Sequence, residues 1–368
     1  MDFPGHLPAG FPFSELLLVA FGVSFALSLI FVLTKRLHGR FSFDRAEGVQ
    51  RFHEEPTPRI GGLALILGVS VAVVMTLRNG GPEQSALYGF IWPVLLAAIP
   101  AFLVGFAEDL TKQVNATPRL VATMISAVAA WALTGISLQH LQVPGLDPLL
   151  AYAWISVPLT AFAVGGIANS LNIIDGFHGL ASGVATIICL SMAAIAVNVG
   201  DLELAMFCAL VAAALVGFLV VNFPFGKLFL GDGGAYFVGF LVGWLAVLLP
   251  MRNPQVSPWA SLLICAYPVA ETLFSIYRRL KDRLHPLEPD REHMHSLVKV
   301  VLVKPHLSHW SSNVRNAAVS PILWIFAAIP AVFGISNYDS LGPLFAGFLI
   351  FCAFYWFIYR LLKSRLSD

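Results

Sequence analysis

Charged side chains are scarce in this 368-residue chain. Asp, Glu, Lys and Arg make up only 12% of it, against roughly a quarter in an ordinary soluble domain. Hydrophobic residues make up 58%. This balance excludes an ordinary soluble protein, and the net charge of +1 gives no reason to expect a nucleic-acid partner.

Cysteines and linkers are also few. The chain has four cysteines, and they are widely spaced inside apolar runs, so they suggest neither a disulfide framework nor a zinc site. No Gly/Ser-rich or Pro-rich linker divides the chain, and no internal repeat is evident, so we expect residues 1–368 to form one domain. The first apolar run lacks the basic residues and cleavage site of a removable signal, and we take it as a membrane span.

Long apolar runs fill most of the sequence. A helix that crosses a bilayer needs about 20 mostly apolar residues. The sequence therefore predicts an all-α, polytopic integral membrane protein with about eleven transmembrane helices. The expected spans are 13–34, 60–77, 87–106, 119–137, 149–168, 179–198, 202–222, 234–250, 257–276, 317–336 and 341–362.

Basic residues lie on one side of these spans. Twenty of the 22 Lys and Arg residues fall in connections on the same side, whereas only Arg78 and Arg252 fall on the other. Because cytoplasmic loops of membrane proteins are enriched in Lys and Arg, we expect the N-terminus outside and the C-terminus in the cytoplasm.

Polar segments gather on the predicted cytoplasmic side as well. Carboxylates at a membrane are costly, and chance would scatter such segments over both faces. Their coincidence indicates one assembled site. The expected catalytic loops are 35–59, 107–118, 169–178, 223–233 and 277–316.

Acidic residues in two of these loops suggest a metal site. Glu108 and Asp109 end the third span, and Asp232 stands in a Gly-rich turn before the eighth. Mg²⁺ prefers oxygen ligands, usually one or two carboxylates with substrate phosphates and water. We expect Asp232 and Asp109 to bind Mg²⁺, or Mn²⁺ in its place, although Asp232 can also be a carboxylate of a phosphate site. The alternative is that the acidic pair only caps the end of its span.

The stretch NSLNIIDGFHG places Asn169, Asn172 and Asp175 three residues apart, with His178 after them. On a helix the first three would share one face. Such groups can read a nucleobase, a ribose or a sugar amide, or they can complete a metal shell. The alternative is hydrogen bonding between helices.

Two histidines follow the ninth span in the segment DREHMHS. On a helix His293 and His295 would point about 200° apart, so both reach one ligand more easily from an extended loop. With Arg291 they can hold a sugar pyrophosphate. A pair of incidental loop histidines is the alternative.

Taken in order, HEEPTPRIGG, GFAEDL, NSLNIIDGFHGL, FLGDGG and PDREHMH resemble the polyprenyl-phosphate N-acetylhexosamine-1-phosphate transferase family, with its WecA-like and MraY-like branches. The resemblance implies an all-helical enzyme of ten or eleven spans. It implies transfer of a phospho-sugar, preferably GlcNAc-1-phosphate, from a UDP-sugar to undecaprenyl or another polyprenyl phosphate, with Mg²⁺ and release of UMP. This is the first membrane step of cell-envelope glycans such as cell-wall polymers and O-antigen.

The resemblance also implies roles for residues. Glu108, Asp109, Asp232 and His293 are expected to be catalytic, with Asp232 as the magnesium ligand. A second set is expected to bind the substrates, namely Arg59, Asn169, Asn172, Asp175, His178, Arg291 and His295.

Three positions depart from the family pattern. Glu108 replaces the first Asp of a pair, His178 replaces the second Asp of DGxDG, and Ser296 replaces a third histidine. The first change keeps a carboxylate, whereas the second exchanges an anion for an imidazole. The identity of the sugar is therefore left open.

Two other functions stay in view. Transfer of phospho-MurNAc-pentapeptide is the alternative within the family, although the PTPRIGG and PDREHMH forms look more like the WecA-like branch. A secondary transporter would place its polar groups near the middle of the bilayer. We expect a multi-pass protein of the bacterial inner membrane with its site facing the cytoplasm, and a homodimer is one option.

Overall fold

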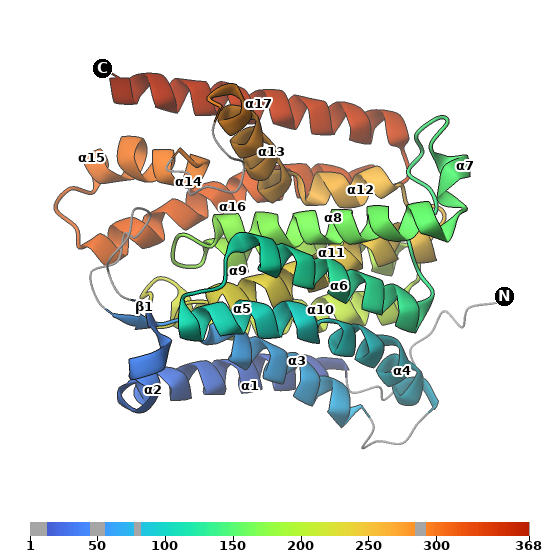
Figure 1. Cartoon of the computed structure of the whole chain (residues 1–368), viewed down its shortest axis with the longest axis horizontal. Helices are drawn as coiled ribbons and strands as arrows, with labels where there is room; N and C mark the ends of the chain where they lie inside the picture. Colours follow the sequence, from blue (N-terminus) through green and yellow to red (C-terminus); the bar gives the residue numbers. More distant parts are fainter. Residues whose placement is uncertain (1–12, 45–55, 77–81, 284–291, 368) are drawn as a thin grey trace.

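The computed structural model describes residues 13–44, 56–76, 82–283 and 292–367, and it confirms an all-α membrane protein (Figure 1). The long helices run side by side along one direction. The first half of the chain contains α1 (Phe13–Leu33), α2 (Lys35–Ser42), α3 (Gly61–Met75), α4 (Pro82–Ala97), α5 (Ile99–Thr111), α6 (Ala116–Thr134), α7 (Asp147–Leu150) and α8 (Ala153–Ile174).

The second half contains α9 (Leu180–Asn198), α10 (Leu202–Asn222), α11 (Gly231–Arg252), α12 (Pro258–Ile264), α13 (Ala266–Lys281), α14 (Met294–Leu297), a π-helix (Val298–Val303), α15 (Lys304–His306), α16 (Ser312–Ser336) and α17 (Leu341–Ser367). Two short strands, β1 (Phe43–Asp44) and β2 (Thr57–Pro58), pair antiparallel beside α2.

All eleven predicted spans contain helix, but one is short. Among the described residues, eight helices are long and apolar enough to cross a membrane, and two bent pairs bring the number to ten. The expected span at 60–77 is the 15-residue α3, about 22 Å long at 1.5 Å per residue. That is less than the ~30 Å of hydrocarbon in a bilayer.

The two bent pairs each carry a proline just after the break. The axes of α4 and α5 differ by 43°, and those of α12 and α13 by 77°. Pro100 and Pro268 lack the N–H that a continuous helix would donate four residues back, so each break lies where a hydrogen bond is missing in any case.

Helix α11 is the centre of the bundle. Its residues from Gly231 to Pro250 are all buried, and it packs against α8, α5, α3 and α9. A Cβ on Gly239 would lie 2.5 Å from Ala168 Cα of α8, and one on Gly243 would lie 3.1 Å from Val164 Cα, as expected for a small-residue contact between membrane helices.

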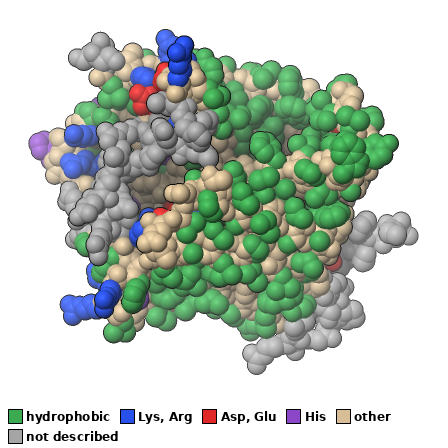
Figure 2. Space-filling model, in the orientation of Figure 1, with side chains coloured by type: hydrophobic (Ala, Val, Ile, Leu, Met, Phe, Trp, Pro, Cys, Tyr) green, Lys and Arg blue, Asp and Glu red, His purple; other side chains and the backbone are tan. Residues whose placement is uncertain are grey.

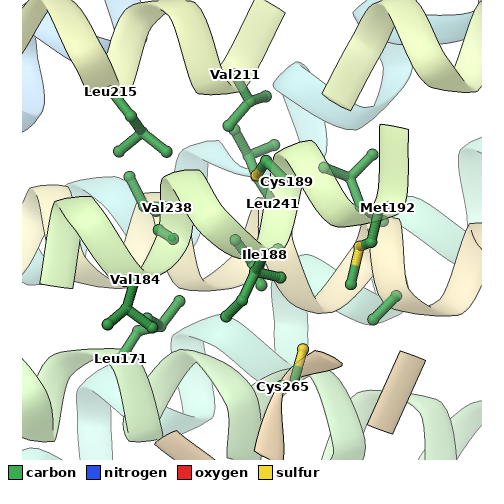
Figure 3. Close-up of a cluster of buried hydrophobic side chains, with 14 of the residues drawn as sticks. Leu171, Val184, Ile188, Cys189, Met192, Val211, Leu215, Val238, Leu241 and Cys265 are labelled. Atoms are coloured by element: carbon green, nitrogen blue, oxygen red, sulfur yellow. The ribbon is translucent and has the colours of Figure 1, made fainter. Parts of the chain in front are cut away.

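Apolar side chains from several helices fill the space beside α11. Figure 3 shows Leu171 of α8, Ile188 of α9, Leu215 of α10 and Val238 of α11 converging in this core. By contrast, only 22% of the α1 span and 17% of the α17 span are buried. These two helices therefore lie at the periphery, where lipid would surround them.

One end of the bundle carries most of the charge. It holds α2, the β1–β2 pair, the end of α5, the start of α11 and α14, and it lies at the left of Figure 1. Figure 2 shows Lys and Arg side chains gathered there, whereas the rest of that face is mostly hydrophobic. We call it the polar end.

Candidate active site

Asp232 lies in the first turn of α11 and has side-chain partners from three other parts of the chain. Its Oδ1 accepts from Arg59 Nη2 at 3.1 Å and from Asn172 Nδ2 at 2.9 Å. Its Oδ2 forms an ion pair with Arg119 of α6. The residue is 7% exposed, so the predicted Gly-rich turn is instead the crowded start of a helix.

Asp109, at the end of α5, is bound to the same helix start. Its two carboxylate oxygens accept from the backbone N–H groups of Asp232 and Gly233, each at 2.8 Å. Arg59 Nε lies 3.3 Å from Oδ1. A carboxylate that accepts from these groups satisfies orphan donors and interacts favourably with the helix dipole. Asp109 therefore fixes α11 to α5.

The glycines around Asp232 allow backbones to meet. A Cβ on Gly105 of α5 would lie 2.6 Å from the Asp232 carbonyl oxygen, and one on Gly62 of α3 would lie 2.5 Å from Gly234 Cα. Gly231 has a φ of +75°, and a side chain there would collide with the Arg59 carbonyl. The predicted Gly-rich turn therefore serves close approach of α3, α5 and α11. We call this contact the glycine junction.

Glu108 is directed to its own loop. Its Oε2 accepts from Val114 N at 2.6 Å, and Lys112 closes the helix end with a φ of +58°. This contact matches the capping alternative raised from the sequence. The catalytic role expected of Glu108 stays a prediction.

The predicted polar face of α8 turns toward α11. Asn172 contacts Asp232, and Asn169 Oδ1 accepts from Tyr236 Oη at 3.4 Å. Asp175 follows the helix end and is partly exposed, but protein surrounds its carboxyl on most sides. Burial raises its pKa well above the usual range, with Arg59 opposing the rise and Asp232 and Asp109 adding to it.

His178 lies against the loop between α10 and α11. It is 4% exposed, its Nδ1 is 3.2 Å from the Pro224 carbonyl oxygen, and its ring packs at 5.9 Å on Phe229. It borders a small hollow with Lys35 and Lys227. Its predicted part in substrate binding stays a prediction.

The two histidines do lie together, as an extended segment would allow. His293 has extended backbone and precedes α14. Its ring stacks on that of His295 at 5.1 Å, and the His295 ring meets Phe177 edge-on at 5.4 Å. Nδ1 of His293 lies 2.9 Å from Glu271 Oε1. The predicted ligand Arg291 is outside the described residues.

Three site residues were not predicted as such. Arg119 was assigned only to the basic cytoplasmic side, although its guanidinium binds Asp232 and lies 5.6 Å from the Tyr236 ring. Tyr236 gave no sequence signal. Glu271 did give one, because it is the single charged residue in the expected span 257–276, and a carboxylate within a span marks a functional site by default.

The donor set suits magnesium better than zinc. Asp109 and Asp232 share the contact with Arg59, and the side-chain amide of Asn172 lies beside Asp232. Within the described ranges, no group of three or more His, Cys, Asp or Glu is placed to hold a metal. Mg²⁺ commonly takes one or two protein carboxylates and completes its shell from substrate phosphates and water, so these residues fit that ion.

Comparisons with known proteins agree with the resemblance found in the sequence. Residues 91–250 match the model of glycosyl transferase family 4. The chain is 28% identical to a probable undecaprenyl-phosphate N-acetylglucosaminyl 1-phosphate transferase of Bacillus subtilis, over 76% of each chain.

Two further relatives carry similar names. A decaprenyl-phosphate N-acetylglucosaminephosphotransferase of Mycolicibacterium smegmatis is 28% identical, over 88% of this chain and 84% of its own. An undecaprenyl-phosphate alpha-N-acetylglucosaminyl 1-phosphate transferase of Yersinia pestis is 25% identical, over 74% of each. The match therefore extends beyond the family segment to most of the chain.

Proposed function

We propose, because residues 91–250 match the model of glycosyl transferase family 4, that the protein transfers N-acetylglucosamine 1-phosphate from UDP-N-acetylglucosamine to a polyprenyl phosphate and releases UMP. The observation that carries the proposal is the joining of Asp232, Asp109, Arg59, Arg119 and Asn172 at one end of the membrane bundle. The names of the relatives support the donor and the lipid.

Arginine side chains are the groups best placed to receive the donor's pyrophosphate. A guanidinium presents several N–H donors in a rigid fork that matches phosphate oxygens. Arg59 and Arg119 are both held by Asp232, so their positions are set before a substrate binds. Preorganised positive charge of this kind stabilises charge that develops during phosphoryl transfer.

A divalent cation would be held by Asp232, with Asp109 beside it. When bound, Mg²⁺ or Mn²⁺ neutralises pyrophosphate charge and makes UMP a better leaving group. Asp109 holds the backbone at Asp232 and Gly233, so it fixes where the Asp232 carboxylate lies. Asn172 donates to the same carboxylate and limits its rotation.

The lipid phosphate can attack without a protein base. A phosphate monoester has its second pKa near 6, so most of it is a dianion at pH 7. One of its oxygens attacks the phosphorus that carries the sugar, and the bond from that phosphorus to the oxygen of UMP breaks. Both oxygens of Asp109 accept from backbone N–H groups, which favours direct transfer over a covalent intermediate on Asp109.

The site is proposed to face the cytoplasm of a bacterial inner membrane, with the N-terminus outside. The excess of Lys and Arg in the connections of the polar end supports this orientation, and UDP-sugars are made in the cytoplasm. The clustering of Asp232, Asp109 and their partners at one end of the bundle also disfavours a transporter, whose polar groups would lie near mid-bilayer.

A panel of donors tests the proposal. Purified protein is mixed with undecaprenyl phosphate, Mg²⁺ and either UDP-N-acetylglucosamine, another UDP-N-acetylhexosamine or UDP-MurNAc-pentapeptide, and UMP release is measured. We expect release with the first donor. Turnover of the peptide donor alone would replace the proposed substrate.

The variant Asp232→Asn tests the site itself. It keeps the size of the side chain but weakens its hold on a cation and on two arginines, so UMP release should fall by at least about 10²-fold. Asp339→Asn, at an exposed position between α16 and α17, is the matched control and should keep the wild-type rate. Unchanged release in the Asp232 variant would remove Asp232 from the chemistry.

A further inference from the structure

Glu271 is a buried carboxylate that the proposed chemistry does not use. It lies on α13, after the bend that follows α12, and is 0% exposed. An ionised carboxylate is strongly disfavoured in such surroundings unless it is paired and hydrogen-bonded. Its partners therefore indicate what it is for.

Those partners belong to the histidine segment. Oε1 of Glu271 lies 2.9 Å from His293 Nδ1, and it also accepts from the Met294 backbone N–H at 3.1 Å. Because the carboxylate oxygen is an acceptor, Nδ1 of His293 carries a proton in this contact. Nε2 is then the nitrogen left to face a ligand, as in the carboxylate–histidine pairs that orient metal-binding histidines.

The histidine pair lies against the turn that ends α8. The His293 ring stacks on His295 with an angle of 20° between the planes. A Cβ on Gly176 would lie 3.3 Å from His295 Nε2, and Gly176 follows Asp175. One side chain, that of His295, thus lies between the ring that Glu271 holds and the turn that carries Asp175.

A separate contact attaches the histidine segment through the Glu292 side chain. Oε2 of Glu292 accepts from Tyr359 Oη at 2.9 Å and from Lys363 Nζ at 2.5 Å, both on α17. The segment therefore has one attachment to α17 through Glu292 and another to α13 through Glu271. Only the second one contacts a histidine ring.

We propose that Glu271 is a positioning residue for His293, which it holds with Nε2 directed at the phosphate-bearing substrates. The inference rests on the proposed transferase function and adds to it a residue that acts through His293. It predicts that Glu271 matters to the rate only while the His293 ring is present.

A double-mutant cycle tests this dependence. UMP release is measured for the wild type, Glu271→Leu, His293→Ala and the double variant, with kcat and KM determined for each. Loss of an orienting partner of this kind typically costs 10- to 100-fold, and we expect Glu271→Leu to lower kcat by about that factor. In the His293→Ala background the same change should have almost no further effect, because the ring it orients is gone.

Conservative variants and controls separate orientation from folding. Glu271→Gln keeps an oxygen that can accept from Nδ1–H and Met294 N–H, so it should restore most of the rate. Glu203→Leu alters a half-exposed carboxylate at the opposite end of the bundle and should leave the rate unchanged. Thermal unfolding in detergent shows whether Glu271→Leu is folded. If it is not, Glu271→Asp takes its place in the cycle, because the shorter side chain withdraws the acceptor by one methylene.

Two outcomes overturn the inference. If Glu271→Leu lowers the rate by the same factor with and without the His293 ring, Glu271 is a purely structural residue. If Glu271→Leu and Glu271→Gln lower the rate equally, the orienting contact is excluded. A wild-type protein that releases no UMP with any donor would instead contradict the proposed function, so the two failures are distinguishable.

Discussion

The Asp232 carboxylate receives its three partners from segments that are far apart in the sequence. Arg59 follows β2, Arg119 is on α6 and Asn172 is on α8. Arg59 and Asn172 donate to Oδ1, and Arg119 pairs with Oδ2. Asp109 accepts from the Asp232 backbone N–H and fixes the position of the backbone. A change at any of these residues therefore alters the position of the others.

Arg119 should be sensitive even to a change that keeps its charge. In Arg119→Lys a compact ammonium group replaces the planar guanidinium. The ammonium cannot reproduce the contacts that the guanidinium makes with Asp232 and a phosphate at the same time. We expect kcat for UMP release to fall by about 10-fold in this variant, and by about 10²-fold or more in Arg119→Ala, the range seen when one donor to a transition state is removed. Steady-state kinetics in detergent measures both.

The exposed Arg360 of α17 provides the control for Arg119. Arg360→Ala removes the same charge from the protein without touching the site, and its rate should equal that of the wild type. A normal rate in Arg119→Ala would show that Asp232 is the only necessary member of this ion pair.

The sequence indicated some of these residues and not others, for physical reasons. Asp232, Asn172 and Asp109 are polar groups at the ends of apolar runs, where burial of charge stands out. Arg119 is one of many basic residues on its side, so composition alone could not separate it. Its contact with Asp232 spans 113 positions and depends on how α6 packs against α8, α5 and α11.

At the scale of helices, a second charged cluster joins α10 to α11 at the end opposite the site. Asp201 caps α10 by accepting from Leu204 N at 3.1 Å, and its carboxylate accepts from Arg252 Nε at 2.8 Å. Burial alone would raise the pKa of Asp201, but hydrogen bonds and charge from Arg252 outweigh it and hold the pKa below its ordinary value.

This lowered pKa gives a pH-dependent prediction. A carboxylate whose pKa is lower in the folded protein stabilises it fully above the ordinary pKa of 3.8, and the stabilisation is lost as the pH falls through the folded value. Asp201→Asn should thus be less stable than the wild type by about 1–3 kcal/mol at pH 7. The difference should shrink below about pH 4.

Thermal unfolding in detergent over a pH series measures the effect. Asp339→Asn, at an exposed position, should follow the wild-type curve at every pH. A difference for Asp201→Asn that stays constant to the lowest pH would assign the loss to the cap geometry and not to the ionised group.

Helix existence was predictable, but helix length and direction were less so. Eleven apolar runs gave eleven helical regions, because a long run that must satisfy its backbone in lipid has few other choices. The pattern could not show that α13 turns by 77° from α12, since apolar residues continue across the break. It also could not show that α8 ends at Ile174, which leaves Asp175 beyond the helix face expected for it.

At the scale of the whole molecule, the distribution of charge predicts which end of the helix bundle faces the cytoplasm and which faces the outside. All four native cysteines are buried or half-buried, so an introduced cysteine would dominate labelling. Pro144 lies in an exposed loop before α7, and Lys281 is exposed at the end of α13. The distribution of Lys and Arg in the sequence predicts that these two connections lie on opposite sides of the membrane.

A membrane-impermeant maleimide therefore reports the orientation. In intact spheroplasts, Pro144→Cys should be labelled and Lys281→Cys should be protected until the membrane is permeabilised, because the end rich in Lys and Arg is retained in the cytoplasm. The wild-type protein serves as the background control. The reverse pattern would place the site outside the cell and contradict a cytoplasmic UDP-sugar donor.

The glycine junction limits how such a protein can diversify. Gly62, Gly105 and Gly231 leave no room for a side chain where α3, α5 and α11 meet, so substitutions there would displace Asp109 and Asp232 together. A different donor preference can arise more easily at positions that depart from the pattern of the family that the sequence resembles, such as His178 and Ser296. Because these glycines bring the backbones into contact, the part of the fold that holds Asp109 and Asp232 tolerates little change.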